Sequence, residues 1–424
     1  MRARTTWHAL LAASALACGG GSGASDAGTP VDAAADVAID APADALPDIS
    51  VDASAYPAFT PEMPKVVDNG GVILAAPKIV TVTWNDDPNQ SLLDAFGDGI
   101  GQSAYWQATT SEYGVGAATS DHVHISTSLP QTMTDAALEK MIADQVDAAP
   151  GSGWPVDDAS TVYVVYVPEA MELTSGNAND CNIEDGYHDE MQTQTVSHLV
   201  YAVVNEGCHD TQDVVSFTTE VASHEMVESA TDPHAETDLA YAGFDEDHYA
   251  WEQWNQRQDE LADACEYFAE ANYESTAPFD DWLQRSWSNA GAAAGHDPCV
   301  PAPAGAYYNA TPLGLDSISI TLKNGSLATK GYSIGVGTKR TVQIGLYSDA
   351  PHAPWTVNVV EGDGFSTPVS HVTIAQTVTS GQNGDVLDVD ITTKSTKASG
   401  VLVTVVSSAS GEPTHYMPFL VATE

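Results

Sequence analysis

The order of apolar and polar residues divides the chain into segments that predict different secondary structures. Residues 161–167, Thr-Val-Tyr-Val-Val-Tyr-Val, form a nearly continuous β-branched and aromatic run, which is typical of a strand buried on both faces. Strands that alternate with helices predict an α/β or α+β main domain with a central mixed sheet. The other predicted elements are strands at 71–74, 79–84 and 198–204, a helix at 91–96 that stops at Gly97, and a helix at 134–148 introduced by Thr132 or Thr134.

The pattern changes after residue 303. Short alternating runs, such as 318–322 and 401–406, are separated by turns rich in Gly, Asn and Ser. This pattern of short strands and turns predicts a C-terminal β-sandwich over residues 304–424, following a main domain over 56–303. The C-terminal part has no cysteine and no cluster of catalytic-type residues, which favours a packing, spacing or binding role.

The N-terminal region predicts secretion. Residues 1–17 join a positive start to a short apolar run, and Ala15-Leu16-Ala17-Cys18 is similar to a bacterial lipobox, with Leu one position late. We expect a lipid on Cys18, with plain cleavage as the alternative. Within residues 18–55 an Asp recurs at every fourth position from Asp32 to Asp52, mostly among Ala, Pro and Val, which predicts a disordered linker. Because no other apolar run reaches about 18 residues, any membrane contact is expected through the lipid alone.

Charge excludes two classes of partner. The 424 residues include 13 Lys and Arg and 59 Asp and Glu, giving a net charge of −46. Such a polyanion is not expected to bind nucleic acid or anionic lipid headgroups. The charge is also uneven, because no Lys or Arg lies between Lys140 and Arg257, where 24 carboxylates occur. These carboxylates form either a solvated acidic surface or, in part, a metal site.

Five cysteines are present, and four of them follow the predicted signal peptide and linker. An extracytoplasmic setting favours disulfides, and four cysteines allow three pairings. We expect Cys181–Cys208 and Cys265–Cys299 because each pair closes a local loop. Buried free thiols are the alternative.

Residues 213–233 contain the chemistry-bearing motif, His224-Glu225-Met226-Val227-Glu228. Val214, Phe217 and Val221 precede it at helical spacing, and the same stripe continues onto His224 and Glu228. These two residues are four apart, so their side chains can share one ion. A buried carboxylate needs a partner, which a divalent cation supplies.

Glu225 directly follows the first predicted ligand. In HExxH metallopeptidases the glutamate at this place is the general base, and here Glu228 replaces the second histidine of that motif. The alternative is an ordinary helix end with a satisfied histidine and solvated acids.

A third ligand is required, and the segment before Cys265 offers Asp263 and Glu260. Asp263 is our predicted third ligand, because it lies close to a cysteine expected to be held in a disulfide. Glu260 is a further possible ligand, and Asp232, just before Pro233, is a possible ligand or support for one. The remaining histidines considered are His188, His209, His234 and His248.

The ligand types favour Zn²⁺, although carboxylates also suit harder ions. The acidic run 245–247 could bind Ca²⁺ but lacks the spacing of an EF-hand loop. The sequence contains neither a phosphate-binding G-x-x-x-x-G-K-S loop nor a G-x-S-x-G nucleophile elbow.

Several blocks resemble the EXORDIUM, or phosphate-induced, family of secreted proteins, over roughly residues 66–300. The blocks are 72–74 with 79–84, Tyr105-Trp106 with Thr109, Thr110 and Tyr113, 162–167, 201–204 with Cys208, and Thr231-Asp232-Pro233. The resemblance is to bacterial relatives with His-Glu-x-x-Glu, since plant members lack that motif. It implies an extracellular or cell-envelope setting and no defined reaction.

These observations predict a surface-anchored, metal-dependent hydrolase, specifically a zinc metallopeptidase acting on a peptide or cell-envelope substrate. His224, Glu228 and Asp263 would bind the ion, and Glu225 would activate water. The alternative is a non-catalytic envelope- or glycan-binding lipoprotein with a structural ion or none. In that case surface tryptophans would contact the glycan, and those considered are Trp251, Trp254, Trp282 and Trp287.

Overall fold

The structure is a computed structural model. It describes residues 51–175, 178–179, 181, 185–209, 212–254, 260–276, 281–300, 305–322, 325–363, 370–394 and 400–423. The predicted signal peptide, Cys18 and most of the predicted linker lie outside these residues. No helix in the described ranges has the length and apolar character needed to cross a membrane.

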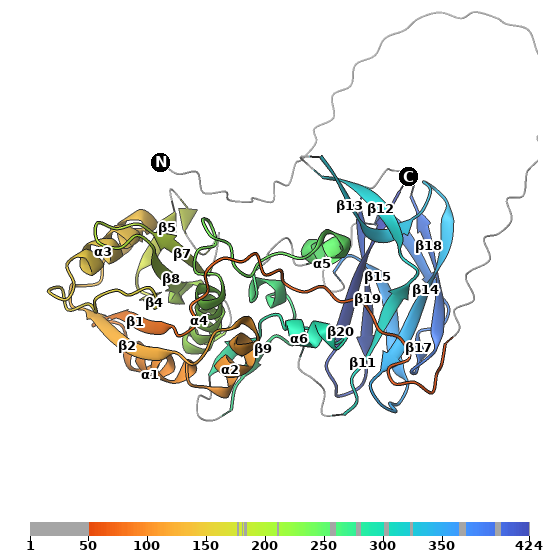
Figure 1. Ribbon diagram of the computed structural model, residues 1–424, viewed down its shortest axis with the longest axis horizontal. Helices are drawn as coiled ribbons and strands as arrows, with labels where there is room; N and C mark the ends of the chain where they lie inside the picture. The colour runs from red at the N-terminus through yellow and green to blue at the C-terminus, as the bar shows by residue number, and fades with distance from the viewer. Residues whose placement is uncertain are drawn as a thin grey trace, which may run out of the picture. The chain divides into compact units, whose positions relative to one another are not determined.

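A five-stranded mixed sheet forms the centre of the α/β region, in the order β2-β1-β4-β8-β7 (Figure 1). The first four strands in this order run parallel, and β7 pairs with β8 in the antiparallel direction. This arrangement confirms the predicted fold class. The strands are β1 (Lys78–Trp84), β2 (Thr119–Ile125), β4 (Thr161–Val167), β7 (Gly186–Met191) and β8 (Leu199–Asn205).

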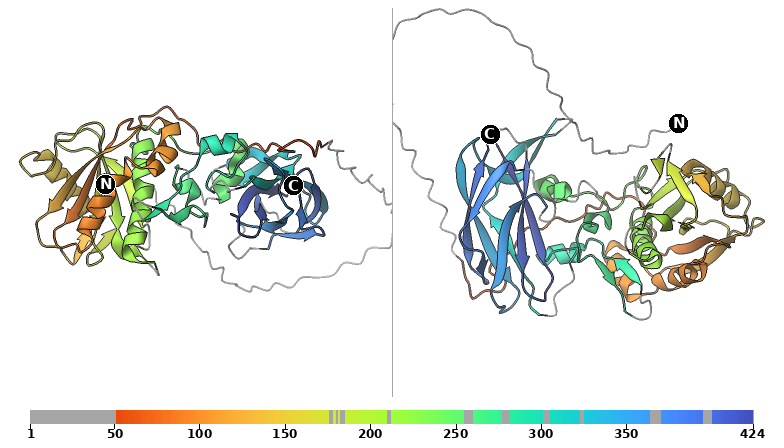
Figure 2. Two further views of the ribbon diagram at one scale, coloured as in Figure 1. Left: turned by 90° about the horizontal axis from the view of Figure 1, so that it is seen from below. Right: turned by 180° about the vertical axis from the view of Figure 1, so that it is seen from behind.

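Helices cover both faces of this sheet (Figures 1 and 2). Apolar residues of α1, α2 and α4 pack with Val162, Val164 and Tyr166 of β4 on one face. Residues of α3 pack with Tyr163 and Val165 on the other. All seven residues of β4 are buried, which explains why the strand is apolar at every position. The helices are α1 (Gln90–Ile100), α2 (Ala104–Thr110), α3 (Asp135–Asp147) and α4 (Val214–Thr231).

Two local predictions are wrong, and the first has a packing reason. Helix α1 continues past Gly97, where a Cβ atom would overlap the hydroxyl of Thr81 on β1. Gly97 therefore permits close packing of helix on strand instead of ending the helix. Residues 71–74 are not a strand in the structure, although the amide of Leu74 donates to the carbonyl of Ala230 on α4. The prediction for α3 is confirmed, and Thr134 caps it by accepting from the amide of Ala137.

The C-terminal region forms the predicted β-sandwich from two larger sheets. One has the order β11-β14-β18-β16 and the other β12-β13-β20-β19-β15-β17, with one parallel pair, β13 and β20. The strands of the first sheet are β11 (Tyr308–Leu313), β14 (Lys339–Ser348), β16 (Val372–Gln376) and β18 (Val386–Thr393). Those of the second are β12 (Asp316–Leu322), β13 (Gly325–Ser333), β15 (Trp355–Glu361), β17 (Ser380–Gly381), β19 (Val401–Ser408) and β20 (His415–Ala422).

Short elements lie between these regions and carry part of the site. They include α5 (Tyr249–Trp254), the single-turn helix η5 (Asp263–Cys265), α6 (Asn289–Ala293), and the hairpin of β9 (Asn272–Glu274) and β10 (Trp282–Gln284). Aromatic residues of this stretch share a core with the sandwich, where the indole of Trp254 donates to the carbonyl of Asp363. The predicted domain boundary after residue 303 lies outside the described residues. The remaining strands, β3 (Thr132–Thr134), β5 (Glu172–Ser175) and β6 (Ala178–Asn179), form a small separate sheet.

Both predicted disulfides are present. Cys181 bonds to Cys208, and Cys265 bonds to Cys299. The paired cysteines are 27 and 34 residues apart in the sequence, so each disulfide closes a local loop. Two disulfides indicate an extracytoplasmic environment.

Candidate metal centre

Helix α4 supplies three residues of a buried acidic centre. Asp213 caps its first turn by accepting from the amides of Val215 and Ser216. The predicted apolar stripe is only partly buried in its first half, where Val214, Phe217 and Val221 are of intermediate exposure and Val221 packs against the core beside the sheet. Residues 222–232 are instead buried on every side, because the helix lies against β7 and β8 and also against β10. His224, Glu225 and Glu228 belong to this buried half.

The three predicted ligands His224, Glu228 and Asp263 meet in space. Nε2 of His224 lies 3.1 Å from Oε2 of Glu228 and 3.3 Å from Oδ1 of Asp263. One ligand atom from each residue falls within 4.8 Å of the others, which is the spacing of a metal-binding group. Asp263 has the most open side chain of the three, at 23% exposed.

The second oxygen of Glu228 fixes the segment that carries Asp263. Oε1 of Glu228 accepts from the main-chain amides of Ala262 and Asp263, each at 2.9 Å. The Cys265–Cys299 disulfide holds the same short turn two residues later. Glu228 therefore positions Asp263 with one oxygen and points the other at His224.

A second group forms around His188 of β7. Nδ1 of His188 lies 3.6 Å from Oε2 of Glu225 and 3.7 Å from Oε2 of Glu228, and the three ligand atoms again fall within 4.8 Å of one another. Glu260 approaches the other ring nitrogen, Nε2, at 3.6 Å. His188 was one unassigned histidine among several in the sequence. It reaches the centre because β7 pairs in the antiparallel direction with β8 and lies against α4.

Each imidazole has a near nitrogen, which faces Glu228, and a far nitrogen on the other side of the ring. A hydrogen-bond partner at the far nitrogen holds each ring in place. Gln284 donates from Nε2 to the carbonyl of Ala262, so its Oε1 is free to accept from Nδ1 of His224 at 3.1 Å. The carbonyl of Asp232 lies 3.2 Å from Nε2 of His188. With protons on these far nitrogens, the nitrogens on the carboxylate side are the ones available to ligate a metal ion. Sequence reasoning missed Gln284, because a single glutamine on a short strand carries no recognisable motif.

Asp232 supports the centre from the end of α4. Its side-chain Oδ1 accepts from the amide of Ala240 at 2.7 Å, and Oδ2 is buried without a hydrogen-bond partner. The structure places its main-chain carbonyl, and not its carboxylate, against His188.

Burial and mutual charge shift the acids and histidines of the centre. Burial raises the pKa of Glu225, Glu260 and Asp263. For Glu228 burial acts in the same direction, but the two histidines outweigh it and lower the pKa of its carboxyl to about 2. Burial alone would lower the pKa of His188 and His224, yet the surrounding carboxylates raise both well above the ordinary value. The carboxylates of the centre therefore favour positive charge on both imidazoles.

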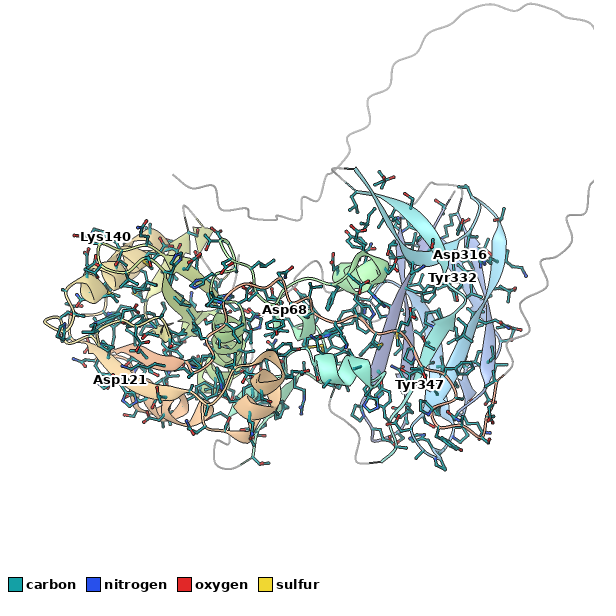
Figure 3. The ribbon with its side chains drawn as sticks, viewed as in Figure 1. Asp68, Asp121, Lys140, Asp316, Tyr332 and Tyr347 are labelled. Carbon is teal, nitrogen blue, oxygen red and sulfur yellow. A yellow bond between two sulfur atoms is a disulfide. The ribbon has the colours of Figure 1, made fainter. Side chains whose placement is uncertain are left out.

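Lysine and arginine residues in the described part of the chain do not supply that charge. Within the described residues, the cationic partners of the four carboxylates are His188 and His224. Lys140 pairs with Asp144 one helical turn away, and Arg340 pairs with Asp316 in the sandwich. Lys140 and Asp316 are labelled in Figure 3. Imidazole nitrogens and carboxylate oxygens gathered without a fixed cation are a donor set that fits a divalent metal ion.

Two further groups have metal-ligand spacing outside this centre. One comprises Glu190, His198 and His234, and the other comprises Asp94, His122 and His124. His209 instead contacts Glu169. In the predicted calcium run, Asp245 accepts from the amide of Asp247 and contacts Nδ1 of His248, so local bonds occupy it.

Comparisons with known proteins do not identify the family of this chain or the function of the site. No protein-family model matches the chain, and no curated protein matches it. One solved structure with local similarity is a Bacteroides ovatus GH5 xyloglucanase in complex with a XXXG heptasaccharide, at 21% identity and a TM-score of 0.15. The similarity covers 22% of this chain and 17% of that one.

Proposed function

We propose that this protein is an extracytoplasmic metal-dependent hydrolase, and more specifically a zinc metallopeptidase. The observation that carries the proposal is the convergence of His224, Glu228 and Asp263, from two separate segments, on one buried point. A bound zinc ion would polarise a scissile carbonyl and acidify water. We also propose the EXORDIUM-like relationship, a lipid anchor at Cys18 and a peptide or cell-envelope substrate, which the extracytoplasmic disulfides are consistent with.

Each residue of the centre would have a distinct role. His224, Glu228 and Asp263 would hold the ion, and Gln284 would keep the ring of His224 in the ligating orientation. Glu225 is the carboxylate to which the motif gives the role of general base. It lies against His188, which could orient it or exchange a proton with it. Asp263, as the most open ligand, would face the approaching substrate.

A second candidate function is a non-catalytic envelope-binding protein with a structural ion. The burial of Glu225 and Glu228, at 5% and 2% exposed, favours it, because structural metal sites are closed. The glycan-contact version of this candidate loses support, because Trp251, Trp254 and Trp287 are buried in the core and cannot form a surface platform.

The two candidates separate in one experiment on the purified full-length chain. Metal content is measured after dialysis, and hydrolysis of casein and of a peptide library is followed for the wild type, for His224→Gln and for the control His198→Gln. A peptidase shows zinc and chelator-sensitive hydrolysis that only His224→Gln abolishes. Bound zinc without hydrolysis of either substrate favours the structural ion. Absence of bound metal contradicts the hydrolase and the structural ion, and favours a binding protein without an ion.

A further inference from the structure

We infer that the buried centre holds two divalent ions that share Glu228. The first ion is the one in the proposed function, on which this inference rests. The second lies between His188, Glu225 and Glu228. This assignment makes Glu225 a metal ligand and replaces the general-base role that the motif alone suggests.

Glu228 is the geometric link between the two halves. Its Oε2 lies 3.1 Å from Nε2 of His224 and 3.7 Å from Nδ1 of His188, so one carboxylate oxygen faces both imidazoles. Each half forms a complete group of three ligand atoms within 4.8 Å, and Glu228 is the only member common to both. A carboxylate that joins two ligand groups is the arrangement of co-catalytic two-metal sites.

Both histidines are held in the way that metal ligands are held. His224 has an amide oxygen of Gln284 at its far nitrogen, and His188 has the carbonyl of Asp232 at its far nitrogen. A hydrogen bond at the far nitrogen fixes the proton there and leaves the near nitrogen as a donor to metal.

Buried charge is consistent with cations at both points. Glu225, Glu228 and Asp263 are the carboxylates of the two ligand groups, and an uncompensated buried charge costs several kcal/mol. Glu260 lies next to Nε2, on the opposite side of His188, and belongs to neither ligand group.

The ligand chemistry narrows the kind of ion. Each half offers one imidazole with carboxylates, a mixture that suits Zn²⁺, Mn²⁺ or Co²⁺ better than ions that prefer thiolates. Two such ions, held by one bridging carboxylate, would bind and polarise the two sides of a bond undergoing hydrolysis.

The inference is tested by loading the chelator-treated full-length protein with Mn²⁺ and recording its electron paramagnetic resonance spectrum. Two ions bridged by Glu228 give an exchange-coupled signal, and this readout needs no variant to fold. Zn²⁺ titration of His188→Gln should then lose one equivalent relative to the wild type and retain the other. The control Glu190→Gln, in the separate group with His198 and His234, should leave the coupled signal intact.

A spectrum of isolated Mn²⁺ only, with an unchanged count in His188→Gln, overturns the two-ion centre. The proposed function fails separately. A single ion with chelator-sensitive hydrolysis retains the hydrolase and rejects the second ion, whereas a coupled pair without hydrolysis retains the two ions and rejects the hydrolase.

Discussion

Oε1 of Gln284 lies 3.1 Å from Nδ1 of His224, while the amide nitrogen of the same glutamine donates to the carbonyl of Ala262. The second bond orients the amide, and the oriented amide determines which nitrogen of His224 faces the carboxylates. Gln284 thus links β10 to the ligand geometry on α4. Gln284→Leu should weaken zinc binding about 10–100-fold, because partners of this kind contribute that much to metal affinity.

The measurement is competition for Zn²⁺ against a chromophoric chelator. Gln343→Leu is the matched control, since Gln343 bonds to Asp388 on the exposed side of the sandwich. Equal zinc affinity in Gln284→Leu and the control would show that the amide does not orient His224.

Glu225→Gln should reduce hydrolysis by about 10²–10⁴-fold, whether Glu225 is a base or a ligand. The number of bound ions separates the two roles. A ligand role predicts the loss of one equivalent of zinc, whereas a base role predicts an unchanged count. Retention of wild-type turnover would contradict both roles, and the measurement pairs a peptide assay with elemental analysis of the same sample.

Removing the Cys265–Cys299 disulfide should destabilise the protein and loosen the ligand Asp263. A 34-residue separation predicts a loss of about 3–4 kcal/mol, because the crosslink restricts the unfolded chain. Denaturant unfolding and zinc affinity are measured for the Cys265→Ala, Cys299→Ala double variant. The corresponding Cys181→Ala, Cys208→Ala variant should lose stability with a smaller effect on zinc. The reverse order of zinc affinities would contradict the positioning role.

Gly97→Ala should destabilise the protein by about 1–3 kcal/mol, because the added methyl group meets the Thr81 hydroxyl. In a Thr81→Ala background the same change should cost less, since the clashing oxygen is absent. A double-mutant cycle by urea unfolding measures this coupling. Additive effects of the two substitutions would show that the contact does not limit the approach of α1 to β1.

His415 should make the sandwich sensitive to acid. It is fully buried between Tyr307 and Tyr308, and neither ring nitrogen has a hydrogen-bond partner. Burial, aided by His296, lowers the pKa of its imidazole from 6.5 to about 3. The stability that depends on the neutral ring is complete above 6.5 and falls as the pH decreases from there toward about 3, because only the unfolded chain then takes up the proton.

The effect amounts to about 1.4 kcal/mol for each pH unit in that window. His415→Phe should remove this part of the pH dependence, while His371→Phe, on a more exposed ring, should not. Unfolding free energies at about pH 7 and about pH 5 provide the comparison. Parallel pH profiles for His415→Phe and the wild type would contradict the assignment.

The sequence predicted those elements whose own pattern of side chains indicates how they are buried or paired. The run 161–167 is apolar at every position, and it became the central strand β4, covered on both faces. His224 and Glu228 could be paired because helical spacing alone brings them together. Asp263 was placed by its closeness to a cysteine whose disulfide is present.

The rest depended on contacts between distant segments. His188 joins the centre only through the antiparallel pairing of β7 with β8, and Gln284 only through a short strand laid across α4. The burial of the second half of α4 likewise comes from neighbours on several sides, which a one-sided apolar stripe cannot indicate. Gly97 was misread because a helix stop and a close helix-strand contact both favour glycine.

The central claim is that the acidic centre around Glu228 exists to hold divalent metal for hydrolysis. Its most direct test is elemental analysis of the full-length protein before and after chelation, with peptide hydrolysis and unfolding free energy measured on the same samples. We expect bound zinc, loss of hydrolysis and of stability on chelation, and recovery of both when zinc is restored. A metal-free protein whose stability is unaffected by chelator would contradict the account.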